Sequence, residues 1–185
     1  MDRYEPCQAP GVLTYMPLFL YDNTDRSVLA LMREDSHRIR KMSPADINSV
    51  QDIERISFPD PWARETLEEA LVTFSDTVFV AENAKGICGY IICGVEDTGE
   101  ERYGHICSLA VDPESRKHGV GAALVRRAEN AAIIQKATAM QLEVRVSNSS
   151  AISFYTRLGY EPVFQICGYY SNTEDAIVMM RWFRY

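Results

Sequence analysis

From residue 37 onwards, apolar positions recur with two different periods, and together they predict one mixed α/β domain. Apolar residues three or four positions apart indicate helices, and alternating or continuously apolar segments indicate strands. The predicted helices lie on either side of Phe58–Trp62 and over 117–135 and 149–158, and the predicted strands cover 37–42, 77–81, 87–95, 105–111, 140–146, 160–167 and 176–182. Three consecutive strands, without a helix between them, exclude a doubly wound sheet built from strict β-α-β units.

Local signals predict where several of these elements begin and end. Ser43-Pro44-Ala45-Asp46 is typical of a helix start, and the two prolines of Phe58–Trp62 end that helix. The continuously apolar segment Ile87–Val95 predicts a central strand covered on both faces, followed by a hairpin turn at Glu96–Glu100. The long helix is predicted to turn four residues inward: Val120, Leu124, Ala131 and Ile134.

The first 36 residues differ from the rest of the chain. They carry short apolar patches, such as Leu18–Leu20 and Val28–Met32, without a sustained period. We interpret residues 1–36 as an N-terminal extension of unknown role and assign residues 37–185 to the folded domain.

Composition narrows the class of protein. The 185 residues are 46% hydrophobic and 24% charged, which is typical of one globular domain. The net charge of -7 argues against general nucleic-acid binding, which depends on neutralising phosphates. No apolar run approaches the roughly 20 residues that span a bilayer, and the N-terminus does not resemble a secretory signal. The 5 cysteines and 3 histidines lack metal-ligand spacing, so we expect no metal site. We also expect a cytoplasmic protein with no membrane association.

The segment Leu109–Leu124 carries the strongest chemical signal. A predicted strand ends at Val111, the basic tripeptide 116–118 follows, and Gly119 and Gly121 open a helix. Unpaired N–H groups and the positive dipole end at a helix start favour an anion, and glycine lets a phosphate approach the backbone. The same residues are equally compatible with an ordinary helix start that has surface charges. The spacing fits neither a P-loop nor a dinucleotide fingerprint.

This segment resembles the pyrophosphate-binding motif of the GNAT acetyltransferase superfamily. Further motifs follow in the family's order: Leu142–Asn148 (LEVRVSN), Tyr155 and Leu158–Tyr160. Together with the elements at 58–62 and 168–176, they resemble the RimI/Ard type of protein N-terminal acetyltransferases. The likeness covers residues 38–182.

The resemblance implies a single GNAT-type domain with a mixed, mostly antiparallel, splayed sheet flanked by helices. It implies that acetyl-CoA lies between the strands 105–111 and 140–146. The backbone of Leu109–Val111 would pair with the pantetheine arm, the loop after it would hold the pyrophosphate, and Asn148 would contact the cosubstrate. The implied cosubstrate-binding residues are Leu109, Ala110, Val111, Arg116, Lys117, His118, Gly119, Val120, Gly121, Ala122 and Asn148. His118 departs from the commonest form of the motif.

The resemblance also implies three catalytic residues. Glu143 would be the general base, Tyr155 the general acid for the CoA thiolate, and His105 a supplementary base, as in archaeal Ard-type enzymes. Strand alternation alone favours a different interpretation of Glu143, a solvated face with a weak Glu143–Arg145 pair. Similarly, Tyr155 on its own is typical of a buried core tyrosine, and a lone histidine is more often structural.

The implied substrate is the α-amino group of a protein N-terminus. Tyr169 and Tyr170 would lie over its backbone, and Phe58, Pro59 and Pro61 would receive the first side chain. Two other functions remain open at this point: acetylation of a small amine or a lysine side chain, and a non-catalytic acyl-CoA-binding subunit. A contact with the ribosome or with an auxiliary subunit, and the oligomeric state, are also left open.

Overall fold

A computed structural model of the protein describes residues 36–183, so the predicted N-terminal extension lies, except for Ser36, outside the described residues. Within that range the strands form one seven-stranded sheet in the order β1-β2-β3-β4-β5-β7-β6. Only β4 and β5 run parallel, and every other neighbouring pair is antiparallel, which confirms the predicted mixed sheet. The strands are β1 (Arg38–Lys41), β2 (Val78–Asn83), β3 (Gly86–Asp97), β4 (Arg102–Val111), β5 (Ala139–Arg145), β6 (Glu161–Ile166) and β7 (Ala176–Trp182).

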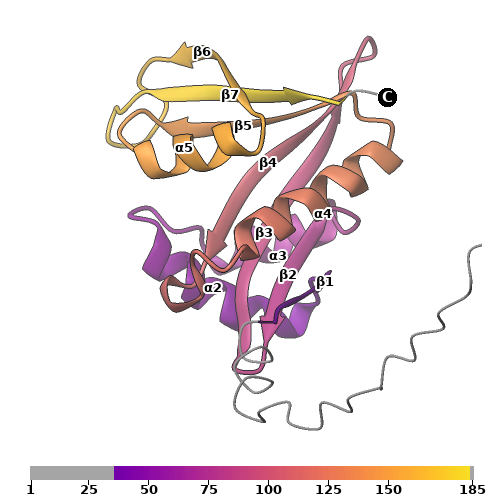
Figure 1. Ribbon diagram of the computed structural model, residues 1–185, viewed down its shortest axis with the longest axis vertical. Helices are drawn as coiled ribbons and strands as arrows, with labels where there is room; N and C mark the ends of the chain where they lie inside the picture. Colours follow the sequence, from indigo (N-terminus) through magenta and orange to yellow (C-terminus); the bar gives the residue numbers. More distant parts are fainter. Residues whose placement is uncertain (1–35, 184–185) are drawn as a thin grey trace, which may run out of the picture.

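Helices cover both faces of the sheet (Figure 1). On one face lie α2 (Ile47–Ser57) and α3 (Arg64–Thr73), and on the other lie α4 (Val120–Ile134) and α5 (Ser149–Arg157). Strand β3 serves both cores, because Tyr90 and Ile92 belong to the first and Ile91 and Cys93 to the second. The prediction of a central strand buried on both faces is therefore confirmed.

The two halves of the sheet separate between β4 and β5. These strands pair only from Tyr103 with Ala139 to Ile106 with Leu142. Beyond those residues β4 continues beside β3, whereas β5 continues beside β7. Figure 1 shows β5, β6 and β7 turned away from β4 like the second arm of a V. The predicted splayed sheet is confirmed, and an edge of each strand is left without a strand partner.

The start of the long helix differs from the prediction. Helix α4 begins at Val120 rather than at Lys117, because Lys117 (φ 67°) and Gly119 (φ 83°) have left-handed backbone conformations that a right-handed helix cannot contain. The inward prediction for Ile134 was also wrong. Its side chain is 79% exposed, because the buried face of α4 runs through Leu124, Ala128 and Ala132, and position 134 lies outside that face.

The hairpin between β3 and β4 is also longer than predicted. Strand β3 extends to Asp97 and β4 begins at Arg102, so Glu96 lies in a strand opposite Tyr103 and not in a turn. Because side chains on one face of an antiparallel pair are neighbours, this register places Glu96 diagonally opposite His105.

The segment between β1 and α2 is held by a buried ion pair. A 3-10 turn at Pro44–Asp46 precedes α2, and the Asp46 carboxylate accepts hydrogen bonds from the Arg40 guanidinium at 2.7 Å and from the Ser43 N–H at 2.8 Å. The hydrogen bonds from Arg40 lower the pKa of Asp46 from its ordinary value of 3.8 to about 2, although burial opposes the shift.

We predict that Asp46→Asn lowers the free energy of unfolding by about 1–2 kcal/mol at pH 7. A carboxyl group whose pKa is lowered in the folded state contributes stability above its unfolded pKa and loses it as the pH falls through the folded pKa. The difference from the wild type, measured by urea denaturation, should therefore be full above about pH 4 and shrink towards pH 2. Asp52→Asn, at an exposed position of α2, is the matched control and should change stability little. A difference that does not depend on pH would contradict the assigned ion pair.

Candidate active site

A cavity of about 490 Å³ lies where β4 and β5 part. Five separate segments converge on it: the end of α2 with the turn after it, β4, β5, α5 and the loop between β6 and β7. The lining residues are Glu54, 57–60, Trp62, 106–109, 142–145, Asn148, Ala151, Tyr155 and 169–171. The site is thus assembled by the fold from segments more than a hundred residues apart.

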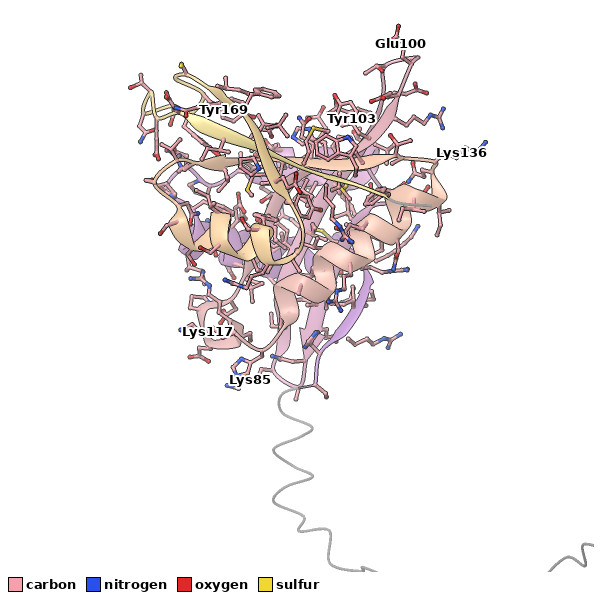
Figure 2. All side chains as sticks on the ribbon, turned by 45° about the horizontal axis from the view of Figure 1, so that its top comes forward. Lys85, Glu100, Tyr103, Lys117, Lys136 and Tyr169 are labelled. Carbon is pink, nitrogen blue, oxygen red and sulfur yellow. The ribbon has the colours of Figure 1, made fainter. Side chains whose placement is uncertain are left out.

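Many of the predicted site residues meet in this cavity. Glu143, Tyr155, Leu109, Asn148, Phe58, Pro59, Tyr169 and Tyr170 all line it. Pro61 does not line it, and neither do His105, Ala110, Val111 or the predicted phosphate-binding residues 116–122. Figure 2 shows Lys117 at the end of the molecule opposite Tyr169 and Tyr103. The predicted site residues therefore extend from the cavity along β4 to the start of α4.

Glu143 is one of the carboxylates that line the cavity, and its side chain is 11% exposed. Its Oε2 lies 2.7 Å from Nε2 of His105, and its Oε1 accepts a hydrogen bond from the Gln141 side chain at 3.0 Å. Burial raises the pKa of Glu143, but the hydrogen bonds and the charge of His105 outweigh it and leave the pKa below its ordinary value. The interpretation of a solvated face with a Glu143–Arg145 pair was wrong, because Arg145 pairs with Asp60 and Glu174 instead.

His105 lies between two carboxylates, one across the hairpin on β3 and the other on the neighbouring strand β5. While Nε2 faces Glu143, Nδ1 lies 2.8 Å from Oε1 of Glu96, whose Oε2 accepts a hydrogen bond from the Tyr103 hydroxyl at 2.7 Å. The hydrogen bond with Glu143 is the main cause that raises the pKa of His105 above 6.5, and Glu96 adds to it. Sequence reasoning missed Glu96, because the predicted hairpin turn began at Glu96, whereas β3 extends to Asp97.

Tyr155 projects from α5 into the other side of the cavity. Its ring packs edge-on against Phe154 and Tyr160, with centroids 5.0 and 5.5 Å away. Burial raises the pKa of Tyr155 well above its usual range, so the phenol stays protonated at neutral pH. Among residues 36–183 its hydroxyl has no hydrogen-bond partner, so it can donate a hydrogen bond into the cavity.

The buried carboxylate of Glu54 positions the turn after α2. It accepts hydrogen bonds from the Trp62 N–H at 3.0 Å and from the Tyr90 hydroxyl, and burial raises its pKa. The turn that supplies Phe58 and Pro59 is thereby tied both to its own helix and to β3. Glu54 was not singled out from the sequence, since a helical glutamate is ordinarily exposed.

Arg145 connects the two loops that face each other across the cavity. Its guanidinium donates to Asp60 at 3.1 Å in the turn after α2, and to Asn172 and Glu174 at 3.0 Å in the β6–β7 loop. The guanidinium also lies 3.8 Å from the centroid of the Tyr170 ring, a cation–π contact. Arg145 therefore fixes the position of Tyr170 relative to the turn that carries Phe58.

The loop between β4 and α4 leaves open space at the start of the helix. Gly119 at φ 83° is the N-cap of α4, and a Cβ there would meet nothing within 4 Å, so open space adjoins the helix start. The first N–H groups of any helix lack intrahelical partners. The left-handed φ of Lys117 is a further feature that bulky residues rarely adopt.

Three predicted cosubstrate residues have contacts within the protein. A Cβ on Gly121 would lie 3.2 Å from the Phe154 ring, so this glycine allows α4 to pack against α5. The Arg116 guanidinium donates to the Val111 carbonyl at 2.9 Å. The Asn148 side chain accepts a hydrogen bond from the Ala151 N–H at 3.0 Å and so caps α5.

No group of three or more His, Cys, Asp and Glu side chains among residues 36–183 is arranged to hold a metal ion. No helix in the same range is long and apolar enough to cross a membrane.

Comparison with known proteins identifies relatives of this domain. The sequence profile of the Acetyltransferase (GNAT) family matches residues 47–160. An uncharacterized N-acetyltransferase of Methanocaldococcus jannaschii is 39% identical over 77% of this chain and 90% of its own length. An N-alpha-acetyltransferase of Sulfurisphaera tokodaii is 32% identical over 77% of this chain and 91% of its own. The crystal structure of Ard1 from Thermoplasma volcanium has a TM-score of 0.75 at 28% identity, over 80% of this chain and 99% of that one.

We predict that Arg145→Ala loosens both loops without unfolding the domain. Removing several charge-assisted hydrogen bonds should speed amide hydrogen exchange about tenfold or more in residues 58–62 and 168–174, measured by mass spectrometry. Arg102→Ala, which breaks the exposed Arg102–Asp97 pair, is the control and should leave these loops unchanged. Unaltered exchange in Arg145→Ala would show that the loops are held by other contacts.

Proposed function

This chain belongs to the acetyltransferase (GNAT) family, and from that premise we propose that it transfers the acetyl group of acetyl-CoA to the α-amino group of protein N-termini. The relatives named N-alpha-acetyltransferase support this substrate class. The observation that carries the proposal is the Glu143–His105 pair, which lies where β4 and β5 part and whose Glu143 lines a cavity bounded by two aromatic loops.

The residues along the parting strands fit acetyl-CoA. The edge of β4 past Ile106 has no strand beside it, so the backbone of Leu109–Val111 can pair with the amides of a pantetheine arm. The start of α4, with Gly119 in a left-handed conformation beside open space, suits a diphosphate. Residues 116–122 would hold that diphosphate, and Asn148 would contact the pantetheine arm. When bound, acetyl-CoA supplies the thioester carbonyl that the amine attacks.

The pair of Glu143 and His105 would act on the incoming amine. An ammonium has no lone pair, so one proton must leave before nitrogen can attack the carbonyl carbon. An α-amino group has a pKa of about 7.7–8.0, against about 10.4 for lysine, so a modest base is sufficient at neutral pH. Glu143 would accept that proton, with His105 beside it to share the charge.

Tyr155 would assist the other half of the reaction. As the C–S bond breaks, the departing sulfur carries the electron pair and takes a proton from the phenol, and the second proton lost by the substrate nitrogen restores the phenol. Because burial keeps Tyr155 protonated and its hydroxyl has no partner among the described residues, it is available for that donation.

The two loops would receive the peptide. Tyr169 and Tyr170 would lie over its first backbone groups, and Phe58 and Pro59 would contact its first side chain. Pro61 would act only on the shape of the turn, since it does not line the cavity. This arrangement suits an extended chain end better than a compact small amine.

Incubation with acetyl-CoA and a random library of N-terminal peptides, read by mass spectrometry, tests the function. We expect acetylation of α-amines, with Glu143→Gln at least about 100-fold slower but still binding CoA by calorimetry. Full activity in Glu143→Gln would contradict its role as the base. Polyamines and internal lysines, assayed in parallel, test the small-amine alternative. CoA binding without turnover of any amine would favour a non-catalytic subunit.

Tyr155→Phe should slow turnover about tenfold rather than abolish it. A thiolate whose conjugate acid has a pKa of about 8.5 leaves with only mild assistance. Steady-state kinetics should show a lower kcat and an unchanged KM for acetyl-CoA. Phe154→Leu, beside Tyr155 and without a hydroxyl to lose, controls for disturbed packing. An unchanged kcat in Tyr155→Phe would remove the phenol from the mechanism.

A further inference from the structure

The imidazole of His105 faces a carboxylate at each ring nitrogen. Glu96 lies 2.8 Å from Nδ1 and Glu143 lies 2.7 Å from Nε2. A neutral imidazole carries one N–H, whereas ionised carboxylates only accept hydrogen bonds. The ring can therefore satisfy both neighbours only when it has taken up a second proton.

The two carboxylates differ in exposure. In each of them, the oxygen that does not face His105 accepts a hydrogen bond from a neutral side chain. Glu96 on β3 is 49% exposed, and Glu143 on β5 is 11% exposed. The Tyr103 hydroxyl donates to Glu96, and the Gln141 amide donates to Glu143. The other titratable groups that interact with these carboxylates are the phenols of Tyr103, Tyr169 and Tyr170 and the thiol of Cys107, whose pKa values are all raised, so all stay neutral at pH 7. Two negative charges thus bear on one imidazole.

We propose that Glu96 is a positioning residue for acetyl transfer: by holding Nδ1–H of His105, it sets the proton affinity of the His105–Glu143 pair to suit an α-amine. This inference rests on the proposed function and refines the role of His105 in it. Glu96 does not line the cavity and lies on the far side of the ring from Glu143, so it acts through the imidazole and, at longer range, through its charge on Glu143.

The proton balance follows from the geometry. Before reaction, Nδ1–H is donated to Glu96, and the lone pair of Nε2 points at a carboxylate oxygen of Glu143. The lone pair of Nε2 and the negative carboxylate oxygen repel each other, and this repulsion is relieved when the His105–Glu143 pair gains a proton. An N–H bond of the substrate ammonium breaks, the proton passes to the Glu143 carboxylate and comes to rest on Nε2, and the freed lone pair attacks the thioester carbon. The imidazolium returns its extra proton to water after the product leaves.

The matching of proton affinities explains why a second carboxylate is useful. A general base works best when its pKa lies near that of the group it deprotonates and near the working pH. Glu143 and then Glu96 raise the pKa of His105 above 6.5, in the direction of the α-amino value of about 7.7–8.0. With Glu143 alone, the pair would be a weaker base.

The test is Glu96→Gln, which keeps the shape and removes the charge. NMR titration of the protein without acetyl-CoA follows the ring resonances of the chain's 3 histidines, and His105→Gln assigns the one of interest. We expect the His105 midpoint in Glu96→Gln to fall by roughly 0.5–1 pH unit. The acidic limb of the kcat profile should move in the same direction, and the plateau at high pH should fall several-fold, with an unchanged KM for acetyl-CoA.

Two control variants separate the charge of Glu96 from its surroundings. Glu100→Gln removes the same charge at the tip of the same hairpin, where Figure 2 shows Glu100 projecting away from the body, and should leave the titration unchanged. Tyr103→Phe keeps the Glu96 charge and should not lower the His105 midpoint. A midpoint that is unaltered in Glu96→Gln, or lowered equally in Glu100→Gln, would overturn the inference.

The titration also distinguishes this inference from the function on which it rests. It is read in the free protein and needs no substrate. If the midpoint falls as expected while the wild type acetylates no peptide, the proposed function is overturned, and with it the use of the pair as a base. If peptides are acetylated and the midpoint does not move, only the role of Glu96 is overturned.

Discussion

The site depends on one interruption of backbone pairing in the middle of the sheet. Strands β4 and β5 are paired from Tyr103 with Ala139 to Ile106 with Leu142, and then they separate. The core with α4 and α5 joins both arms of the V, whereas the core with α2 and α3 belongs to the β1–β4 arm. The separation leaves an unpaired strand edge and opens a cavity beside it, and the last paired residues before it place His105 on β4 diagonally across from Glu143 on β5. Without it, these residues would be ordinary positions of a continuous sheet.

One face of β5 carries three different tasks in alternate positions. Gln141 supports the carboxylate of Glu143, Glu143 faces the cavity, and Arg145 holds the loops that close over it. The opposite face contributes Leu142 and Val144 to the core with α4. Strand alternation thus separates the chemistry from the packing, so that the polar face can be specialised while the apolar face maintains the fold.

Much of this arrangement could be predicted from the sequence. The rest depended on strand register and on contacts between distant segments, which cannot be read from a single sequence. Helical and strand periods located the elements, and the resemblance of residues 142–160 to the GNAT motifs predicted the half of the candidate site that lies in one continuous segment. The start of α4 was misplaced because positive φ at Lys117 is not encoded by residue type, unlike that at Gly119. Glu96 was missed because its contact with His105 follows from the hairpin register, and the partners of Arg145 come from loops 85 and 29 positions away in the chain.

The most direct test of this account is a crystal structure of the protein with a conjugate that joins CoA covalently to the nitrogen of an N-terminal peptide. The account requires the conjugate to lie between the parting strands, with its diphosphate within hydrogen-bond distance of N–H groups of residues 117–122 and its peptide nitrogen beside Glu143. A conjugate bound elsewhere, or a diphosphate that contacts none of these amides, would contradict it.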